Sequence, residues 1–306
     1  MSFSTSERFT ALDPKDLDRL EALAKLDEFA AGQEILVSGQ PAGDEEERRH
    51  SWLYLIASGT VDVRAKTPSG DTTLVELQAG DLFGELESFC ELPEGVRHVA
   101  RTATICRVIP KNPLLQELKA HRSLATGLLS VYCKSISGKI RATNDVAVRM
   151  GPAGGNLLSR PPPPASAAGG RPPHLSEAEA AWMRVLGSEI GLPSGTVAVE
   201  EGDTTRAFFV IDEGTCAVRK RVGGDSRTLA TLSALDMFGF MAFVDGKPRS
   251  ASVVAASDVR LSRIESDVLD KALHLNFTVA FKFLGTLCGV LGRTYRDTVR
   301  AVIASS

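Results

Sequence analysis

The sequence predicts a mainly β fold with helices, built from two tandem domains. Each domain is an antiparallel β structure, closed or split into two sheets, that is followed by helices. Three observations predict this fold class. Short apolar runs alternate with polar residues around regular turns, as in antiparallel strands. Apolar residues then recur at helical spacing, and the two halves of the 306-residue chain repeat the same order.

The repeat runs without a gap at a shift of 155 residues. At this shift residues 54–66 (YLIASGTVDVRAK) lie over residues 209–221 (FVIDEGTCAVRKR). Residues 73–85 (TLVELQAGDLFGE) lie over residues 228–240 (TLATLSALDMFGF). Because the period has the size of a domain, the pattern indicates a duplicated domain rather than a solenoid.

Each half begins with predicted strands. The runs on either side of Ser58-Gly59, and those on either side of Glu213-Gly214, alternate apolar and polar residues. We therefore predict a β-hairpin at each of these turns. The first half also carries about eight extra residues upstream, in the charged segment 41–50, which we expect to be a solvated insertion.

Two helices are predicted after the strands of each half, and the repeat pairs Cys133 with Cys288 inside the second helix of each pair. Two interpretations remain open for these last helices. Each helix packs on its own domain, or the helices form the seam of a homodimer. In the second case the small residues Gly285 and Gly289 would let two helices approach closely.

A change of composition marks the boundary between the halves. Residues 151–173 contain seven of the 15 prolines in the chain, and such a segment extends as a spacer rather than forming a core. We therefore divide the chain into four parts: an N-terminal helical segment (1–28), a first domain (29–146), a Pro/Gly-rich linker (147–173) and a second domain (174–306).

Bulk composition limits the classes of partner. The net charge is −3, so nothing favours binding to a nucleic-acid backbone. The apolar runs are too short to span a bilayer, and the first ten residues lack a signal-peptide pattern. The five cysteines are scattered without a CxxC motif, which fits buried thiols in a reducing cytoplasm. We expect a cytoplasmic protein without a membrane partner.

An ordered set of motifs occurs in both halves. Two glycine-marked turns come first, at Gly32 and Gly39 and at Gly195 and Gly202. A turn with SG or EG follows, then D-x-F-G, then a proline ten residues after the phenylalanine. This order resembles the cyclic nucleotide-binding domain family, which includes the cyclic AMP receptor protein and the regulatory subunit of protein kinase A. The resemblance covers roughly residues 29–141 and 192–296. It implies two tandem β-rolls (jelly-roll-like), each with a short phosphate-binding cassette and C-terminal helices.

In outline the family cassette is F-G-E-L-A followed by P-R-A-A, and the resemblance implies a role for each part. The glycine lets the backbone approach the ligand. The arginine forms a forked, charge-assisted hydrogen bond with the phosphate. The glutamate accepts a hydrogen bond from the ribose 2′-hydroxyl, as an acidic residue does in dinucleotide folds.

The first half (FGELESFCELPEGV) keeps Gly84 and Glu85 of this cassette. It has Glu94 where the family has its arginine, and Glu87 and Glu91 add negative charge nearby. Because like charges repel, we expect the first pocket to reject a cyclic phosphate and not to function in binding. Two nearby arginines could replace the missing one only with a different backbone geometry: Arg97 and Arg101.

The second half (FGFMAFVDGKPRSASV) keeps the phosphate part of the cassette. Its candidate ligand-binding residues are Gly239, Arg249, Ser250 and Ala251. Phe240 replaces the glutamate, and the loss of a charged hydrogen bond of roughly 1.5–3 kcal/mol weakens binding by about one to two powers of ten. The alternative for Arg249 is a surface arginine paired with a carboxylate such as Asp245. We expect Arg249→Ala to abolish binding with folding nearly unchanged, and Phe240→Glu to strengthen binding.

Two functions from different classes follow. The first is a non-enzymatic regulatory protein that senses cAMP, cGMP or another phosphate-bearing small molecule through the second domain, without any other cofactor. It would pass the signal to a protein partner supplied in trans. The second is a protein-interaction or dimerisation scaffold whose two pockets are degenerate. A folded protein that binds no ligand would favour the second function.

An enzyme, a metal site and a DNA-binding regulator are not expected. No GxSxG or Walker-type loop occurs. Too few residues follow the last predicted helix for a DNA-binding domain, and no basic pseudosubstrate stretch precedes the first domain. The histidines are isolated from one another, which suits structural or solvated roles better than metal ligation: His50, His98, His121, His174 and His274.

Overall fold

The computed structural model of the chain describes residues 1–38, 51–150, 173–222 and 225–304. The chain divides into two compact units, which are treated separately below. One unit consists of Met1–Thr143 with Ala280–Ala304, and the other of Asn144–Val279. The charged insertion at 41–50 and residues 151–172 of the predicted linker (147–173) lie outside the described residues.

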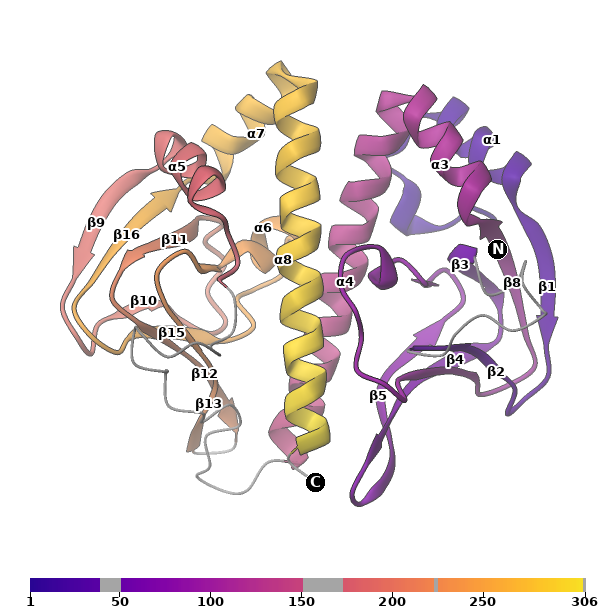
Figure 1. The fold of residues 1–306 in the computed structure, drawn as a ribbon, viewed down its shortest axis with the longest axis horizontal. Helices are drawn as coiled ribbons and strands as arrows, with labels where there is room; N and C mark the ends of the chain where they lie inside the picture. Colours follow the sequence, from indigo (N-terminus) through magenta and orange to yellow (C-terminus); the bar gives the residue numbers. More distant parts are fainter. Residues whose placement is uncertain (39–50, 151–172, 223–224, 305–306) are drawn as a thin grey trace. The chain divides into compact units, whose positions relative to one another are not determined.

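The β part of the first unit consists of two four-stranded antiparallel sheets (Figure 1). Their strand orders are β1-β8-β3-β6 and β2-β7-β4-β5. Apolar side chains of both sheets are buried, including Leu53, Leu55 and Val61 with no exposed surface. The strands are β1 (Lys25–Phe29), β2 (Glu34–Val37), β3 (Ser51–Ser58), β4 (Thr60–Thr67), β5 (Gly70–Gln78), β6 (Leu82–Phe83), β7 (Arg97–Ala100) and β8 (Thr104–Pro110).

The second unit repeats this topology, with sheets β9-β16-β11-β14 and β10-β15-β12-β13. Its strands are β9 (Ser188–Leu192), β10 (Val197–Val199), β11 (Phe208–Glu213), β12 (Cys216–Val222), β13 (Asp225–Leu232), β14 (Met237–Phe238), β15 (Ser252–Ala255) and β16 (Val259–Ile264). Two rolls with the same strand order confirm the predicted fold class and the duplication.

The two predicted hairpins are wrong in one respect. The strands and the turns exist, but β3 pairs with β6 and β8, whereas β4 pairs with β5 and β7. The chain therefore changes sheet at Gly59, which has a φ of +88°. A Cβ atom there would lie 2.5 Å from the carbonyl oxygen of Ala103, so the corner requires glycine. Gly214, with a φ of +84°, forms the equivalent corner against Asp258.

Helices follow the strands of each roll, as predicted. α3 (Lys111–Ala120) and α4 (Arg122–Met150) come after the first roll, and α7 (Ser266–Leu275) and α8 (Phe277–Ala304) after the second. α1 (Pro14–Leu23) and α5 (Glu177–Leu186) precede the rolls. A capping box between Ser176 and Glu179 caps the N-terminus of α5. Short helical segments occupy the cassettes: η2 (Leu86–Ser88) and α6 (Phe240–Asp245). A further short one, η1 (Glu7–Phe9), lies at the N-terminus.

From Ala280 onward α8 belongs to the first unit. A Cβ atom at Gly285 would meet nothing within 4 Å, and one at Gly289 would meet only Arg293 of the same helix. A Cβ atom at Gly292, in contrast, would lie 3.2 Å from Cβ of Phe89 and 3.4 Å from Sγ of Cys90. The close approach of α8 to the first cassette therefore depends on Gly292, and within the described chain Gly285 and Gly289 have no such role.

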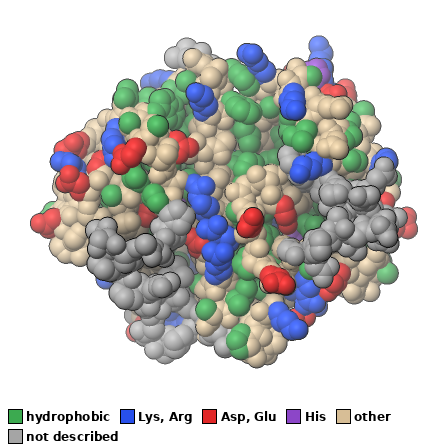
Figure 2. All heavy atoms as spheres, viewed as in Figure 1, with side chains coloured by type: hydrophobic (Ala, Val, Ile, Leu, Met, Phe, Trp, Pro, Cys, Tyr) green, Lys and Arg blue, Asp and Glu red, His purple; other side chains and the backbone are tan. Residues whose placement is uncertain are grey.

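Charged side chains of both signs are spread over the face drawn in Figure 2, and a group of Lys and Arg side chains lies over α8. Within the described ranges no helix combines the length and the apolar character needed to cross a bilayer.

Candidate ligand-binding site

The first cassette starts at Gly84, which has a φ of +92° and leads from β6 into η2. The next residue, Glu85, is completely buried. Its Oε1 atom accepts hydrogen bonds from Ser135 Oγ at 2.9 Å and from Lys139 Nζ at 2.5 Å. Both donors lie on α4, and Lys139 is itself buried. The Oε2 atom of Glu85 has no hydrogen-bond partner among the described residues.

The carboxylate that the resemblance assigns to the ribose is therefore bound by a cation of the protein itself. A buried ion pair is costly to desolvate, and removing one member leaves the other buried and unpaired. Lys139 thus holds the first cassette against α4 through Glu85. This contact has structural value without any ligand.

The position of the family arginine is exposed in the first cassette. Glu94 lies there, and Glu87 and Glu91 are exposed as well. The described part of the first cassette thus presents carboxylates, and no arginine side chain, at the place where a phosphate would bind. That the first pocket rejects an anion stays a prediction.

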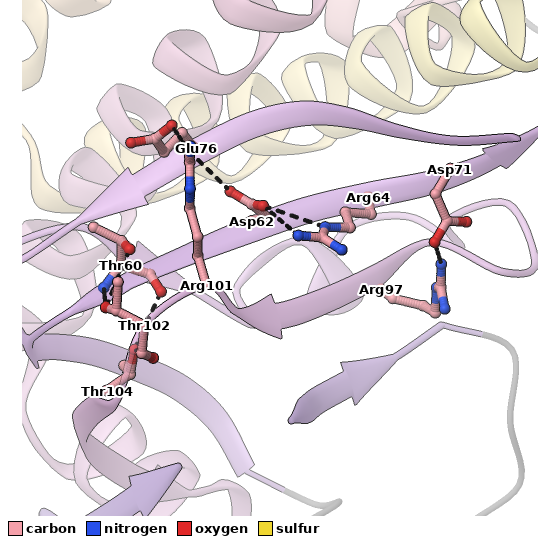
Figure 3. Close-up of polar contacts among 9 residues, drawn as sticks. All are labelled: Thr60, Asp62, Arg64, Asp71, Glu76, Arg97, Arg101, Thr102 and Thr104. Carbon is pink, nitrogen blue, oxygen red and sulfur yellow. Dashed lines mark hydrogen bonds and ion pairs between the residues drawn. The ribbon is translucent and has the colours of Figure 1, made fainter. Parts of the chain in front are cut away.

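Arg97 and Arg101, the two nearby arginines, are engaged elsewhere (Figure 3). Arg97 donates to Glu34 at 2.8 Å and to Asp71 at 2.6 Å. Arg101 donates to Glu76 and lies 3.8 Å from Asp62, which also accepts a 2.7 Å hydrogen bond from Arg64. Both guanidinium groups are paired with carboxylates of the β-roll, so neither is available to the cassette in this conformation.

A stack of three rings lies inside the first roll. Phe83, just before Gly84, stacks on Tyr54 with ring centroids 4.6 Å apart and on His98 at 4.9 Å. His98 is almost completely buried. Burial, together with the nearby charge of Lys139, lowers the pKa of His98 to about 3, so the imidazole is neutral at neutral pH. This histidine has a structural role, as its isolation in the sequence predicts.

The second cassette starts at Gly239, which has a φ of +84° and is followed by α6. A Cβ atom at Gly239 would lie 2.9 Å from an amino nitrogen of Arg249 and 3.1 Å from the carbonyl oxygen of Ala207. Glycine is therefore required here both by the backbone conformation and by the approach of the arginine.

Arg249 lies inside the second cassette with 5% of its surface exposed. Its backbone N–H donates to Asp203 O at 2.8 Å, and its carbonyl accepts from Gly202 N at 3.0 Å. Its guanidinium donates to Gly239 O and to Ala207 O, each at 2.5 Å. The alternative of a surface arginine paired with Asp245 is therefore wrong, because Arg249 is buried and its guanidinium donates to backbone carbonyls.

The guanidinium of Arg249 keeps one donor without an acceptor. Its Nε–H group is buried and has no hydrogen-bond partner among the described residues. Burial lowers the pKa of Arg249, whereas the charge of Asp203 acts in the opposite direction. Thr205 connects the two residues, because its Oγ1 atom donates to Asp203 at 2.7 Å and lies 3.4 Å from an amino nitrogen of Arg249. The arginine is thus a charged and incompletely satisfied group.

The other predicted residues of the second cassette differ in their contacts. Phe240, the first residue of α6, is buried and offers no acceptor. The carbonyl of Ser250 accepts from Lys220 Nζ at 3.1 Å. Ala251 is buried against Leu229. The structure therefore brings Gly239 and Arg249 into contact, while Ser250 and Ala251 adjoin them along the chain.

Sequence reasoning missed the partners of both key residues. Lys139 and Ser135 lie four positions apart on a helix, so they share a face, but nothing in their spacing points to Glu85. Thr205 and Asp203 lie in a loop more than forty residues before Arg249, and no pattern in the sequence connects them.

Comparisons with known proteins identify proteins that are similar to this chain. A family model described as "Cyclic nucleotide-binding domain" matches residues 26–121 and 189–276. The cAMP-dependent protein kinase regulatory subunit of Mycosarcoma maydis is 33% identical over 116 residues, which are 37% of this chain and 21% of that protein. The protein of the same name from Dictyostelium discoideum is 35% identical over 89 residues, 29% of this chain and 27% of that protein. The matches thus span only about a fifth to a quarter of the curated relatives.

Among solved structures, the regulatory domain of Toxoplasma gondii PKA with cAMP matches this chain. It is 17% identical with a TM-score of 0.31, and the match covers 92% of this chain and 90% of that one. A cyclic nucleotide-binding domain from Methylobacillus flagellatus is 24% identical with a TM-score of 0.40, over 43% of this chain and 75% of that one.

Proposed function

The chain belongs to the cyclic nucleotide-binding domain family, and from this premise we propose that it is a non-enzymatic regulatory protein whose second domain binds a phosphate-bearing small molecule. The ligand is a cyclic nucleotide, cAMP or cGMP, or a related compound. One observation carries the proposal: Arg249 is a buried cation whose Nε–H group has no acceptor among the described residues. A phosphate oxygen is an acceptor of the charge and geometry that this group suits.

The same cassette limits affinity. Phe240 is buried where the family has a glutamate, so a ribose hydroxyl finds no carboxylate there. A charged hydrogen bond is worth about 1.5–3 kcal/mol, so its absence weakens binding by roughly one to two powers of ten. We expect binding in the micromolar range or weaker, and a ligand that is held chiefly through its phosphate.

The first domain does not take this ligand in our proposal. Glu85 is paired with Lys139 and Ser135, Glu94 replaces the arginine, and Arg97 is paired with Glu34 and Asp71. A phosphate entering the first cassette would meet carboxylates without a free arginine. The first domain thus acts as a folded module that supports the second one or contacts a partner.

The output of the protein goes to a partner supplied in trans. The curated relatives are named as regulatory subunits of a cAMP-dependent protein kinase, and a subunit acts on another chain. A protein kinase is therefore the class of partner that we propose for this chain. The matches span 21% and 27% of those proteins, so this partner is part of the proposal.

A specific observation favours a second candidate function, a protein-interaction scaffold. Each cassette lacks one of the two key residues, and Oε1 of Glu85 is already paired with Lys139 without ligand. If Arg249 is equally satisfied by Gly239 O and Ala207 O, both pockets are structural. The protein would then fold, bind its partner and ignore nucleotides.

Calorimetric titration of the full chain with cAMP and with cGMP, at millimolar ligand, separates the two functions. We expect weak binding to the native protein, little or none to Arg249→Ala and Arg249→Lys, and native binding to Arg260→Ala. Arg260 is a matched control, because it is exposed on β16 of the same unit and pairs with Glu213. Phe240→Glu should bind more tightly than the native protein.

Folding must be measured alongside, because the structure revises the expectation that Arg249→Ala leaves folding nearly unchanged. Removing the guanidinium leaves the carbonyls of Gly239 and Ala207 without their donors, at a cost of about 1–3 kcal/mol. Urea unfolding of each variant therefore accompanies the titration. Flat traces for the folded native protein would refute the sensor and favour the scaffold. Binding that persists in folded Arg249→Ala would refute the assigned site.

A further inference from the structure

Two cysteine thiols face each other inside the first unit. Sγ of Cys133 on α4 lies 3.2 Å from Sγ of Cys288 on α8. Cys133 has 1% of its surface exposed and Cys288 has none. Both are free thiols in the structure. They also occupy the same position in the two halves of the duplicated sequence.

The contacts around the pair are reciprocal. The Cys133 thiol lies 3.8 Å from the carbonyl oxygen of Leu284 on α8, and the Cys288 thiol lies 3.5 Å from that of Leu129 on α4. Leu129 and Leu284 are equivalent by the same 155-residue shift. Two equivalent helical turns thus meet face to face, and this arrangement directs both sulfur atoms to one point between the helices.

From this geometry we propose that Cys133 and Cys288 are an oxidation site, at which a peroxide converts the two thiols into a disulfide that joins α4 to α8. The sulfur atoms must approach by only about 1 Å to reach bonding distance. First, a thiol and hydrogen peroxide give a sulfenic acid and water. Then the second thiol displaces water from the sulfenic acid and forms the disulfide. The two sulfur atoms together lose two electrons, which reduce one peroxide to water.

Position, rather than thiol acidity, selects this pair among the five cysteines. Burial raises the pKa of Cys90 and Cys106 to about 12 and that of Cys216 to about 11. Burial and the neighbouring Cys133 also raise the pKa of Cys288. None of these four thiols is an activated thiolate, so all four react slowly. Only at Cys133 and Cys288 does a second thiol lie beside the sulfur, where it can trap a sulfenic acid.

The bond would have a defined consequence. It would fix α8 to α4 within the first unit and close a loop that contains the whole chain between residues 133 and 288. Such a cross-link reduces the freedom of the unfolded chain and stabilises the folded one. A motion of α8 away from α4 would be blocked in the oxidised protein and allowed in the reduced protein.

The test uses the full chain treated with hydrogen peroxide, then unfolded, alkylated and digested without reductant. Mass spectrometry should find one cross-linked peptide pair, Cys133 with Cys288, lighter by two hydrogen atoms than the two reduced peptides. Thermal unfolding should shift upward by several degrees after oxidation and return when dithiothreitol is added. Cys133→Ser and Cys288→Ser should each lose the shift, whereas the matched control Cys106→Ser with Cys216→Ser should keep it.

The wild-type peptide map decides the proposal even if a serine variant fails to fold. Recovery of both cysteines as free thiols, after the partly exposed Cys90 has been oxidised, would overturn it. A disulfide of either cysteine with Cys90, or one between two chains, would overturn it as well.

Discussion

His98 lies inside the first roll, where its ring stacks on Phe83 and only 1% of its surface is exposed. Burial lowers its pKa from 6.5 to about 3. In the unfolded chain the imidazole takes up a proton near pH 6.5, whereas in the folded chain it stays neutral down to about pH 3. The unfolded state therefore binds more protons in this window, and acid favours unfolding.

We predict that the free energy of unfolding falls as the pH drops from about 6.5 towards 3, by up to about 1.4 kcal/mol per pH unit from His98 alone. Above pH 6.5 this contribution is constant. His98→Phe keeps a ring on Phe83 but cannot titrate, so it should flatten this slope. Urea unfolding at about pH 7, 5.5 and 4 measures the slope of each variant.

The matched control is His121→Gln. His121 is partly exposed and lies outside the ring stack of Phe83, so its loss should leave the contribution of His98 in place. If His98→Phe and the native protein lose stability equally between pH 6.5 and 4, the neutral, buried state of His98 is incorrect.

At the scale of single residues, the sequence indicated which residues to examine in each cassette, but it did not indicate which residues they contact. The cassette pattern singled out Arg249 and Glu85 as the key residues of their segments, and this assignment stays a prediction. It could not indicate that Arg249 is buried against Gly239 O and Ala207 O, because these contacts depend on a distant loop. It also gave no sign that Glu85 would be paired with Lys139, which lies fifty-four residues later.

Among the elements, α4 has the most direct effect on the first cassette. Lys139 and Ser135 hold Glu85, so α4 is fastened to the segment that follows β6. Lys139→Met should destabilise the protein by about 3–5 kcal/mol, because it leaves a buried carboxylate without its counterion. Lys134→Met changes an exposed lysine on the same helix and should change stability by less than about 0.5 kcal/mol.

Urea unfolding of the two variants provides the comparison. A double variant, Glu85→Leu with Lys139→Met, should recover part of the loss, since no unpaired charge remains buried. Equal stability of Lys139→Met and Lys134→Met would mean that the pair does not fasten α4 to the cassette.

Strands and helices were predictable where a local pattern determines them. The alternating runs around Gly59 became β3 and β4, and the helical spacing around Cys133 became α4. The pairing of the strands was not predictable in this way. Alternation shows that a strand has a buried face, but not which strand lies beside it, so the corner at Gly59 resembled a hairpin. The role of Gly292 likewise depends on Phe89, a residue far away in the sequence.

For the whole molecule, the duplication left two different cassettes on one fold. Both rolls have the same strand order and both keep the glycine corner, so the architecture of the two halves is the same. The ligand residues have diverged: the first cassette has Glu85 without an arginine, and the second has Arg249 without a glutamate. The charge of Glu85 is paired with an internal lysine, although its Oε2 atom has no partner among the described residues, whereas no carboxylate forms a close ion pair with the described Arg249, whose Nε–H group is also without a partner. The two halves should therefore differ in binding although they agree in fold.

This difference predicts the stoichiometry of binding. We expect one cyclic nucleotide per chain in a calorimetric titration, taken up by the second domain. Glu94→Arg restores an arginine in the first cassette, yet the stoichiometry should stay at one, because Lys139 still occupies Glu85 and the restored guanidinium would gain no ribose contact beside it. Exposed Glu91 would still repel a phosphate. Two ligands bound per native chain would show that the first cassette is a working site, and that an internal ion pair at Glu85 does not prevent binding.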